Sequence, residues 1–340
     1  MSKQIYRLWI PDEYRKAGPS DLIELKPVPG FHPLFFRKAE LEQIVYSIVA
    51  NEPCHISGPT GTAKSSLIEA LYRVPENFFA LSAAVEFPKK PLRLYPIQVL
   101  TYETPGELYQ RRALRDGTTF DEKSLLVLAL EEAGGLVKNY YPLIWLRELG
   151  RVHSSSVQGG LLDMMTTGDI VLPDGSRING SGISWIADSN YQAENDSTHT
   201  LVVFDTALKR RFCVNITLDY LPVEQETLVV REILKKEKPR GYQKTDEELI
   251  DKIVMLGHAI RRQRDEGNLH SAPPPTISGY LAFVRMAIRL RHLSLQQVAM
   301  ATLLGHCSRE DSKQASAVLN EVFGLQAIEA DDPAMGVNLF

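Results

Sequence analysis

Short apolar runs alternate with longer amphipathic stretches from about residue 33 to residue 222. Runs of this kind, separated by segments whose apolar residues recur with helical spacing, predict a parallel sheet covered by helices on both faces. The runs expected to form strands are centred on Ile56, 80–82, 96–100, 143–146, 183–187 and 214–218. Ligands of such sheets bind beyond the carboxyl ends of the strands.

After Pro222 the strand-like pattern stops and helical periodicity takes over. The expected helices cover residues 224–236, 246–264, 277–292 and 295–304. We therefore predict a polar N-terminal arm over residues 1–30, an α/β core over 31–222, a helical subdomain over 223–306 and a tail over 307–340. Within 169–182, the Asp174-Gly175 pair between apolar residues predicts a β-hairpin.

Composition narrows the class of protein. The 340 residues carry a net charge of −4, which argues against a nucleic-acid coat protein. The three cysteines are far apart and lack metal-like spacing, so neither a disulfide nor a zinc site is expected. No apolar run has the length of a membrane span or of a signal core, and we expect a cytoplasmic protein. The arginines near residue 261 are interpreted as a solvated helix face.

A motif typical of a phosphate-binding loop is the feature of the sequence that indicates a ligand. An apolar strand residue, Ile56, is followed by Gly58-Pro59-Thr60-Gly61-Thr62-Ala63-Lys64-Ser65-Ser66 and then by helical spacing. Backbone N–H groups of such a loop bind the phosphates of ATP, Lys64 reaches the β/γ-phosphates, and the Ser65 hydroxyl ligates Mg²⁺. The alternative is an ordinary strand-turn-helix corner.

Ala63 departs from the loop pattern, which has glycine at this position. A methyl group fits here with little strain if Ala63 takes a negative φ in the first helical turn.

Three further segments occur in the order expected of an AAA+ ATPase, and the chain most resembles the MoxR branch of that family. The first is an apolar strand ending in Arg147-Glu148; the second is Ile186-Ala187-Asp188-Ser189-Asn190; the third is Lys209-Arg210-Arg211-Phe212. The resemblance covers about residues 30–305, and it implies a P-loop NTPase core with a C-terminal all-α lid. Residues 104–120 resemble a pore-facing hairpin of this branch, and 169–182 resemble its second inserted hairpin.

The resemblance also implies roles for single residues. Glu148 matches the catalytic glutamate, Asn190 matches the first sensor, and Arg211 or Arg210 matches the arginine finger that reaches a neighbouring subunit. Without the P-loop, the same residues would be interpreted as a surface ion pair of Glu148 with Arg147, a turn cap, and helix-end cations.

Two positions depart from the family pattern besides Ala63. Arg147 replaces the aspartate that supports Mg²⁺, so metal binding should weaken unless another carboxylate compensates, and Arg147 could instead contact the phosphates. Tyr280 stands where the lid normally offers an arginine, and a tyrosine cannot neutralise phosphate charge.

The favoured function is an ATP-hydrolysing remodeller that works as a homo-oligomer, expected to be a hexameric ring. The resemblance implies a protein client and a von Willebrand factor A-type partner. Two alternatives stay open: a nucleotide-gated scaffold with little turnover, and a nucleic-acid motor or GTP-using restriction subunit. The sequence does not identify the client.

Overall fold

The computed structural model describes residues 21–152, 154–166, 169–190, 205–243, 246–305 and 307–324. These residues form two compact units, the first ending at Tyr220 and the second beginning at Leu221. The predicted boundary at residue 222 lies close to this division. Predictions for residues 1–20, 204 and 325–340 lie outside the described residues.

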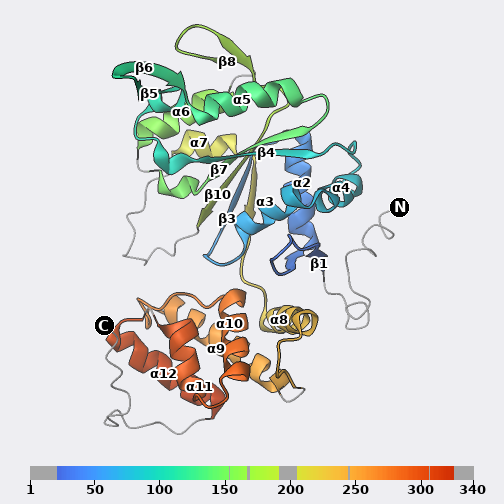
Figure 1. The fold of residues 1–340 in the computed structure, drawn as a ribbon, viewed down its shortest axis with the longest axis vertical. Helices are drawn as coiled ribbons and strands as arrows, with labels where there is room; N and C mark the ends of the chain where they lie inside the picture. The colour runs from blue at the N-terminus through green and yellow to red at the C-terminus, as the bar shows by residue number, and fades with distance from the viewer. Residues whose placement is uncertain are drawn as a thin grey trace. The chain divides into compact units, whose positions relative to one another are not determined.

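A five-stranded parallel sheet forms the centre of the first unit, in the order β11-β3-β10-β7-β4 (Figure 1). The strands are β3 (Cys54–Gly58), β4 (Leu92–Gln98), β7 (Tyr141–Arg147), β10 (Ser184–Asn190) and β11 (Val214–Thr217). Because β10 lies between β3 and β7, the carboxyl ends of these three strands are neighbours. The predicted α/β fold with a parallel sheet is confirmed.

Helices cover both faces of this sheet. One face packs on α2 (Lys38–Ala50), α3 (Lys64–Arg73) and α4 (Pro75–Ala84); the other packs on α5 (Leu125–Leu136), α6 (Ser155–Thr166) and α7 (Thr206–Arg211). The side chains of β7 alternate accordingly: Leu143 and Trp145 belong to the first core, and Ile144 and Leu146 to the second. Burial on both faces explains why these strands are apolar without alternation.

In the part of the chain that the structure describes, three antiparallel strand pairs accompany the sheet. They are β1 (Leu22–Leu25) with β2 (Leu34–Arg37), β5 (Gln110–Arg115) with β6 (Thr118–Lys123), and β8 (Asp169–Val171) with β9 (Arg177–Asn179). Asp174 and Gly175 lie between β8 and β9. Short helical turns are η1 (Val99–Thr101), η2 (Pro105–Leu108) and η3 (Leu149–Arg151).

Two sequence predictions for this unit need correction. Residues 80–82 lie in α4 and not in a strand, because Pro75 starts a helix whose apolar residues reach the same core. The polar arm predicted for residues 1–30 does not describe β1, since Leu22, Ile23 and Leu25 are buried.

The second unit is helical in its described part. Its elements are α8 (Val223–Glu237), α9 (Glu247–Asp265), α10 (Ile277–Arg289), α11 (Leu295–Ala299), η5 (Met300–Leu304) and α12 (Arg309–Phe323). The first five follow the predicted helices closely, while α12 lies in the segment predicted as a tail, residues 307–340. Ala315 and Leu319 of α12 are buried, and Phe323 packs on Phe283 of α10.

No helix in the described residues is both long enough and apolar enough to cross a membrane.

Candidate nucleotide site

Strand β3 leads through residues 59–63 into α3, and the backbone of this loop is tightly constrained. A side chain at Gly58 would place its Cβ 2.0 Å from the Leu218 carbonyl oxygen, and Gly61 has a φ of 87°. Both positions therefore favour glycine. The loop is also braced by a hydrogen bond from the Thr62 hydroxyl to the Pro59 carbonyl, 3.0 Å. The first N–H groups of α3 have no intrahelical partners, as at any helix start.

Ala63 lies in the left-handed region, with φ 61° and ψ 25°, immediately before α3. The methyl group would fit with little strain only at a negative φ, and Ala63 does not have one. A left-handed alanine costs about 1 kcal/mol relative to glycine. The loop keeps the conformation that suits glycine even though alanine occupies the position.

Lys64 is buried in the loop, with 5% of its surface exposed. Its ammonium donates to the carbonyls of Gly58 (2.9 Å) and Pro59 (2.8 Å) and lies 3.4 Å from the Thr62 hydroxyl oxygen. Burial lowers the pKa of Lys64 to about 8, and the charge of Asp188 opposes part of this shift. Lys64 is therefore a buried cation of the loop and not a solvent-exposed one.

Ser65 contacts a carboxylate that the sequence interpretation did not single out. Its hydroxyl donates to Asp188 Oδ2 at 2.9 Å, and the other carboxylate oxygen accepts from Trp145 Nε1 at 2.8 Å. The backbone N–H of Glu148 lies 3.3 Å from the same oxygen. Asp188 therefore joins the ends of β10, β7 and α3.

The two residues of the Arg147-Glu148 pair do not pair with each other in the structure. The Arg147 guanidinium lies over the Trp145 ring, 4.8 Å from its centroid. The Glu148 carboxylate lies 3.3 Å from Arg151, and its side chain is 36% exposed. Glu148 has a φ of 54°, an unfavourable conformation of the kind that clusters at functional sites.

Asn190 ends β10 and lies beside Gly58 of the neighbouring strand β3. The structure thus brings Asn190, the loop and Lys64 to the same edge of the sheet. Ser189 faces the other way, where its hydroxyl is 2.7 Å from His55 Nε2. Burial lowers the pKa of this histidine.

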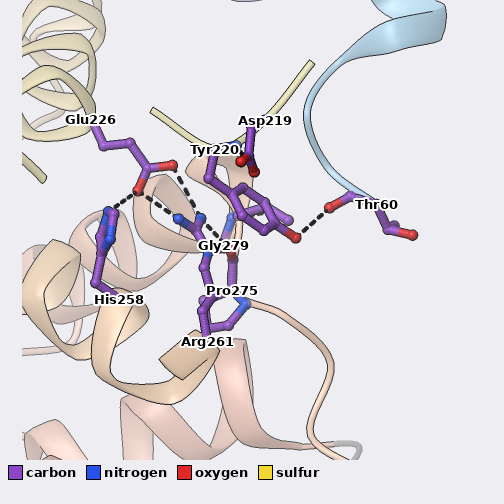
Figure 2. Close-up of polar contacts among 9 residues, drawn as sticks. Thr60, Asp219, Tyr220, Glu226, His258, Arg261, Pro275 and Gly279 are labelled. Carbon is purple, nitrogen blue, oxygen red and sulfur yellow. Dashed lines mark hydrogen bonds and ion pairs between the residues drawn. The ribbon is translucent and has the colours of Figure 1, made fainter. Parts of the chain in front are cut away.

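Tyr220 is a second residue that sequence reasoning missed. Its phenol donates to the Thr60 carbonyl at 2.8 Å, as Figure 2 shows, and so ties the loop to the chain that follows β11. No local motif marks such a contact.

Arg210 and Arg211 are exposed in the last turn of α7, which ends one residue before the buried Phe212. Their exposure is compatible with both interpretations, an arginine finger or helix-end cations. In the second unit, Tyr280 is completely buried. Its ring lies 5.7 Å from the Arg261 guanidinium, and a side chain at Gly257 would collide with it.

Arg261 is buried as well, so the interpretation of this segment as a solvated helix face is wrong for this residue. Figure 2 shows its guanidinium between the Glu226 carboxylate and the Pro275 carbonyl. His258 Nε2 lies 2.9 Å from the same carboxylate. This network holds α8 and α9 together.

Comparison with known proteins identifies no family. No protein-family model matches the chain, and no curated protein matches it. A solved structure of a candidate ATPase from Cytophaga hutchinsonii is 15% identical, with 86% of this chain and 90% of that chain covered and a TM-score of 0.37. A TM-score this low carries neither a fold nor a function from that protein to this chain.

Proposed function

We propose that the chain binds ATP with Mg²⁺ at the loop between β3 and α3 and hydrolyses it. The observation that carries this proposal is Lys64, a buried cation whose hydrogen-bond partners among the described residues are all neutral. A polyphosphate would supply the anion, and the glycine-bearing backbone leaves no side chain in its way at Gly58 and Gly61. The residues present therefore fit the nucleotide.

Each residue of the loop has a defined part in this proposal. The N–H groups at the start of α3 would bind phosphate oxygens, and Lys64 would exchange its contacts with loop carbonyls for the β/γ-phosphates. The Ser65 hydroxyl would hold Mg²⁺, which when bound would neutralise charge on the phosphate oxygens. Pro59, Thr60, Thr62 and Ala63 would form the loop around the phosphates, and Ser66 lies in the first turn of α3.

Glu148 and Asn190 are the proposed catalytic residues. Glu148 would orient and polarise the attacking water, which requires its carboxylate to leave Arg151. Asn190 would contact the same water and the terminal phosphate. Both side chains lie at the edge of the sheet where the loop begins.

We further propose an AAA+ assembly of the MoxR type, with an oligomeric ring and a protein client. The support is the order of motifs in the sequence, together with the exposed Arg210 and Arg211 and the antiparallel hairpin β5–β6. Leu114 of that hairpin is 74% exposed, an apolar residue suited to contact a client. A von Willebrand factor A-type partner belongs to the same proposal.

Steady-state ATP hydrolysis by the wild type and by Glu148→Gln tests the catalytic proposal. We expect turnover to fall by at least about 100-fold, because the amide is a poor base, while ATP affinity stays within about threefold. A wild type that binds ATP but turns over no faster than Glu148→Gln would support the nucleotide-gated scaffold. The Ala63 and Arg147 departures favour that second candidate.

Mixing two variants tests the ring. Subunits of Arg211→Ala mixed with subunits of Glu148→Gln should show an activity that differs from the average of the two pure variants. Arg210→Ala, one position earlier, is the matched comparison. If the chain is a monomer in the presence of ATP and its activity is independent of protein concentration, the ring proposal is wrong. Both arginines are then helix-end cations.

A further inference from the structure

Strand β10 places a carboxylate beside the position where β7 carries Arg147. The two strands are parallel, and Ala187 pairs with Leu146. The next residues, Asp188 and Arg147, therefore occupy neighbouring positions at the carboxyl ends of adjacent strands. Asp188 points to the same face of β10 as Ile186, which packs in the core beneath α3.

Three donors fix the orientation of the Asp188 carboxylate. One oxygen accepts from the Ser65 hydroxyl, and the other accepts from Trp145 Nε1 and faces the Glu148 N–H. Asp188 is only 4% exposed, so this arrangement is built into the core edge and is not a surface contact. Since a hydroxyl has one proton, the Ser65 oxygen keeps its lone pairs available for a cation.

Arg147 cannot supply the missing carboxylate, and its position over the Trp145 ring gives it a different environment. Trp145 thus lies between the two charged groups, contacting Arg147 through its face and Asp188 through its N–H. The cation at the end of β7 is held by the tryptophan, while the anion that contacts Ser65 comes from β10.

We propose that Asp188 is the carboxylate that supports the Mg²⁺ of bound ATP in this chain, in place of the residue at position 147. The proposal rests on the proposed function, because Mg²⁺ enters this site with the nucleotide. Asp188 would accept hydrogen bonds from water on the metal, with Ser65 as the direct protein ligand. The nucleotide site would then have a carboxylate for the metal although β7 carries an arginine at position 147.

The test is the affinity of the full-length chain for ATP, measured by calorimetry with excess EDTA and again with excess Mg²⁺. In the wild type, Mg²⁺ should tighten binding by about tenfold or more. In Asp188→Asn this gain should fall to about twofold or less, and the affinity in EDTA should be unchanged or tighter because a negative charge near the phosphates is gone.

The variant is designed to keep the local structure. An asparagine oxygen still accepts from Trp145, and its amide can donate to the Ser65 oxygen. Glu69→Gln is the matched control: it removes one carboxylate from the same helix α3, where Glu69 pairs with Arg73, and it should bind as the wild type does in both conditions.

Exchanging the charge between strands gives a second, independent variant. Arg147→Asp combined with Asp188→Asn returns a carboxylate to β7, and it should recover the Mg²⁺-dependent gain that Asp188→Asn alone loses. Mn²⁺ bound in the ATP complex broadens the magnetic-resonance signals of the nucleotide. This broadening reports metal occupancy directly in the same set of variants.

The outcomes separate the two proposals. If the wild type binds no ATP in either condition, the proposed function is wrong and this inference falls with it. If the wild type gains affinity from Mg²⁺ and Asp188→Asn gains equally, the function stands and the role of Asp188 is wrong. Equal weakening of Asp188→Asn in EDTA and Mg²⁺ would also overturn the inference, since Asp188 would then only shape the loop.

Discussion

Lys64 and Arg261 are both buried cations, with 5% and 6% of their surfaces exposed, but their surroundings differ. Arg261 donates to both oxygens of Glu226, at 3.0 and 3.1 Å, and to the Pro275 carbonyl. Lys64 donates to carbonyl groups of its own loop. A buried cation is costly unless it is paired, and the lowered pKa of Lys64 reflects this cost.

Under the proposed function, this difference separates a structural cation, Arg261, from a ligand-binding cation, Lys64. Arg261 has its counterion in place and connects α8 to α9. Lys64 is held ready in a loop whose backbone suits an anion, which is the arrangement expected of a ligand site. Substituting each cation should therefore affect different properties of the protein.

Lys64→Met should have the largest effect, on binding alone. We expect ATP affinity to fall by at least about 1,000-fold, or about 4 kcal/mol, because the cation aimed at the phosphates is lost. The free energy of unfolding should change by no more than about 1 kcal/mol, because the variant also removes an unfavourable buried charge. Calorimetry and urea unfolding measure the two effects. Unchanged ATP affinity of Lys64→Met would show that the P-loop interpretation is wrong.

Arg261→Met should show the opposite pattern, with a loss of about 3 kcal/mol in the free energy of unfolding. The cause is the Glu226 carboxylate, which would remain buried and would keep His258 Nε2 as its side-chain partner among the described residues. Arg262→Met is the control on the same helix: Arg262 is 73% exposed and 3.8 Å from Glu266, so its loss should cost less than about 0.5 kcal/mol. Equal costs for the two variants would show that the buried pair does not stabilise the unit.

The pH dependence of ATP binding gives a further test of the environment of Lys64. Because the pKa of Lys64 is lowered to about 8 in the free protein, the ammonium is lost as pH rises through this value, and ATP then has to restore the proton. Affinity should fall by about tenfold between pH 7 and pH 9 and be nearly flat below pH 7. A flat ATP affinity up to pH 9 would contradict the position of Lys64.

Ala63→Gly should have the smallest effect, a gain of about 0.5–1 kcal/mol in the free energy of unfolding. Glycine adopts the left-handed conformation of residue 63 without the steric cost that alanine bears. Ala80→Gly, within α4, is the matched control and should lose about 1 kcal/mol. Thermal unfolding of both variants checks the opposite signs, and a loss in Ala63→Gly would mean that the alanine is not strained.

The sequence alone predicts most elements of the fold, for identifiable physical reasons. β7 and β10 are almost continuous apolar runs because both of their faces are buried. The helices α8 to α10 are visible from their charge pattern and spacing. The strand prediction for residues 80–82 is wrong because a short apolar run in a buried helix has the same appearance as a strand.

The site is predicted less completely, because its decisive contacts depend on strand order. The loop motif predicts that Lys64 and Ser65 belong to the candidate site, but it does not predict which residues contact them. Asp188 meets Ser65 only because β10 lies between β3 and β7, which no local pattern in the sequence reveals. Arg261 was interpreted as solvated because its partner Glu226 is 35 residues away in the chain.

Proton uptake on ATP binding is the most direct test of whether Lys64 is a buried cation that binds a phosphate ligand. Calorimetric titrations in buffers of different ionisation enthalpy give the number of protons taken up by the full-length protein. With a pKa of about 8 for Lys64, we predict about 0.9 proton at pH 9 and about 0.1 proton at pH 7. Binding without proton uptake at pH 9, or no ATP binding at either pH, would contradict the claim.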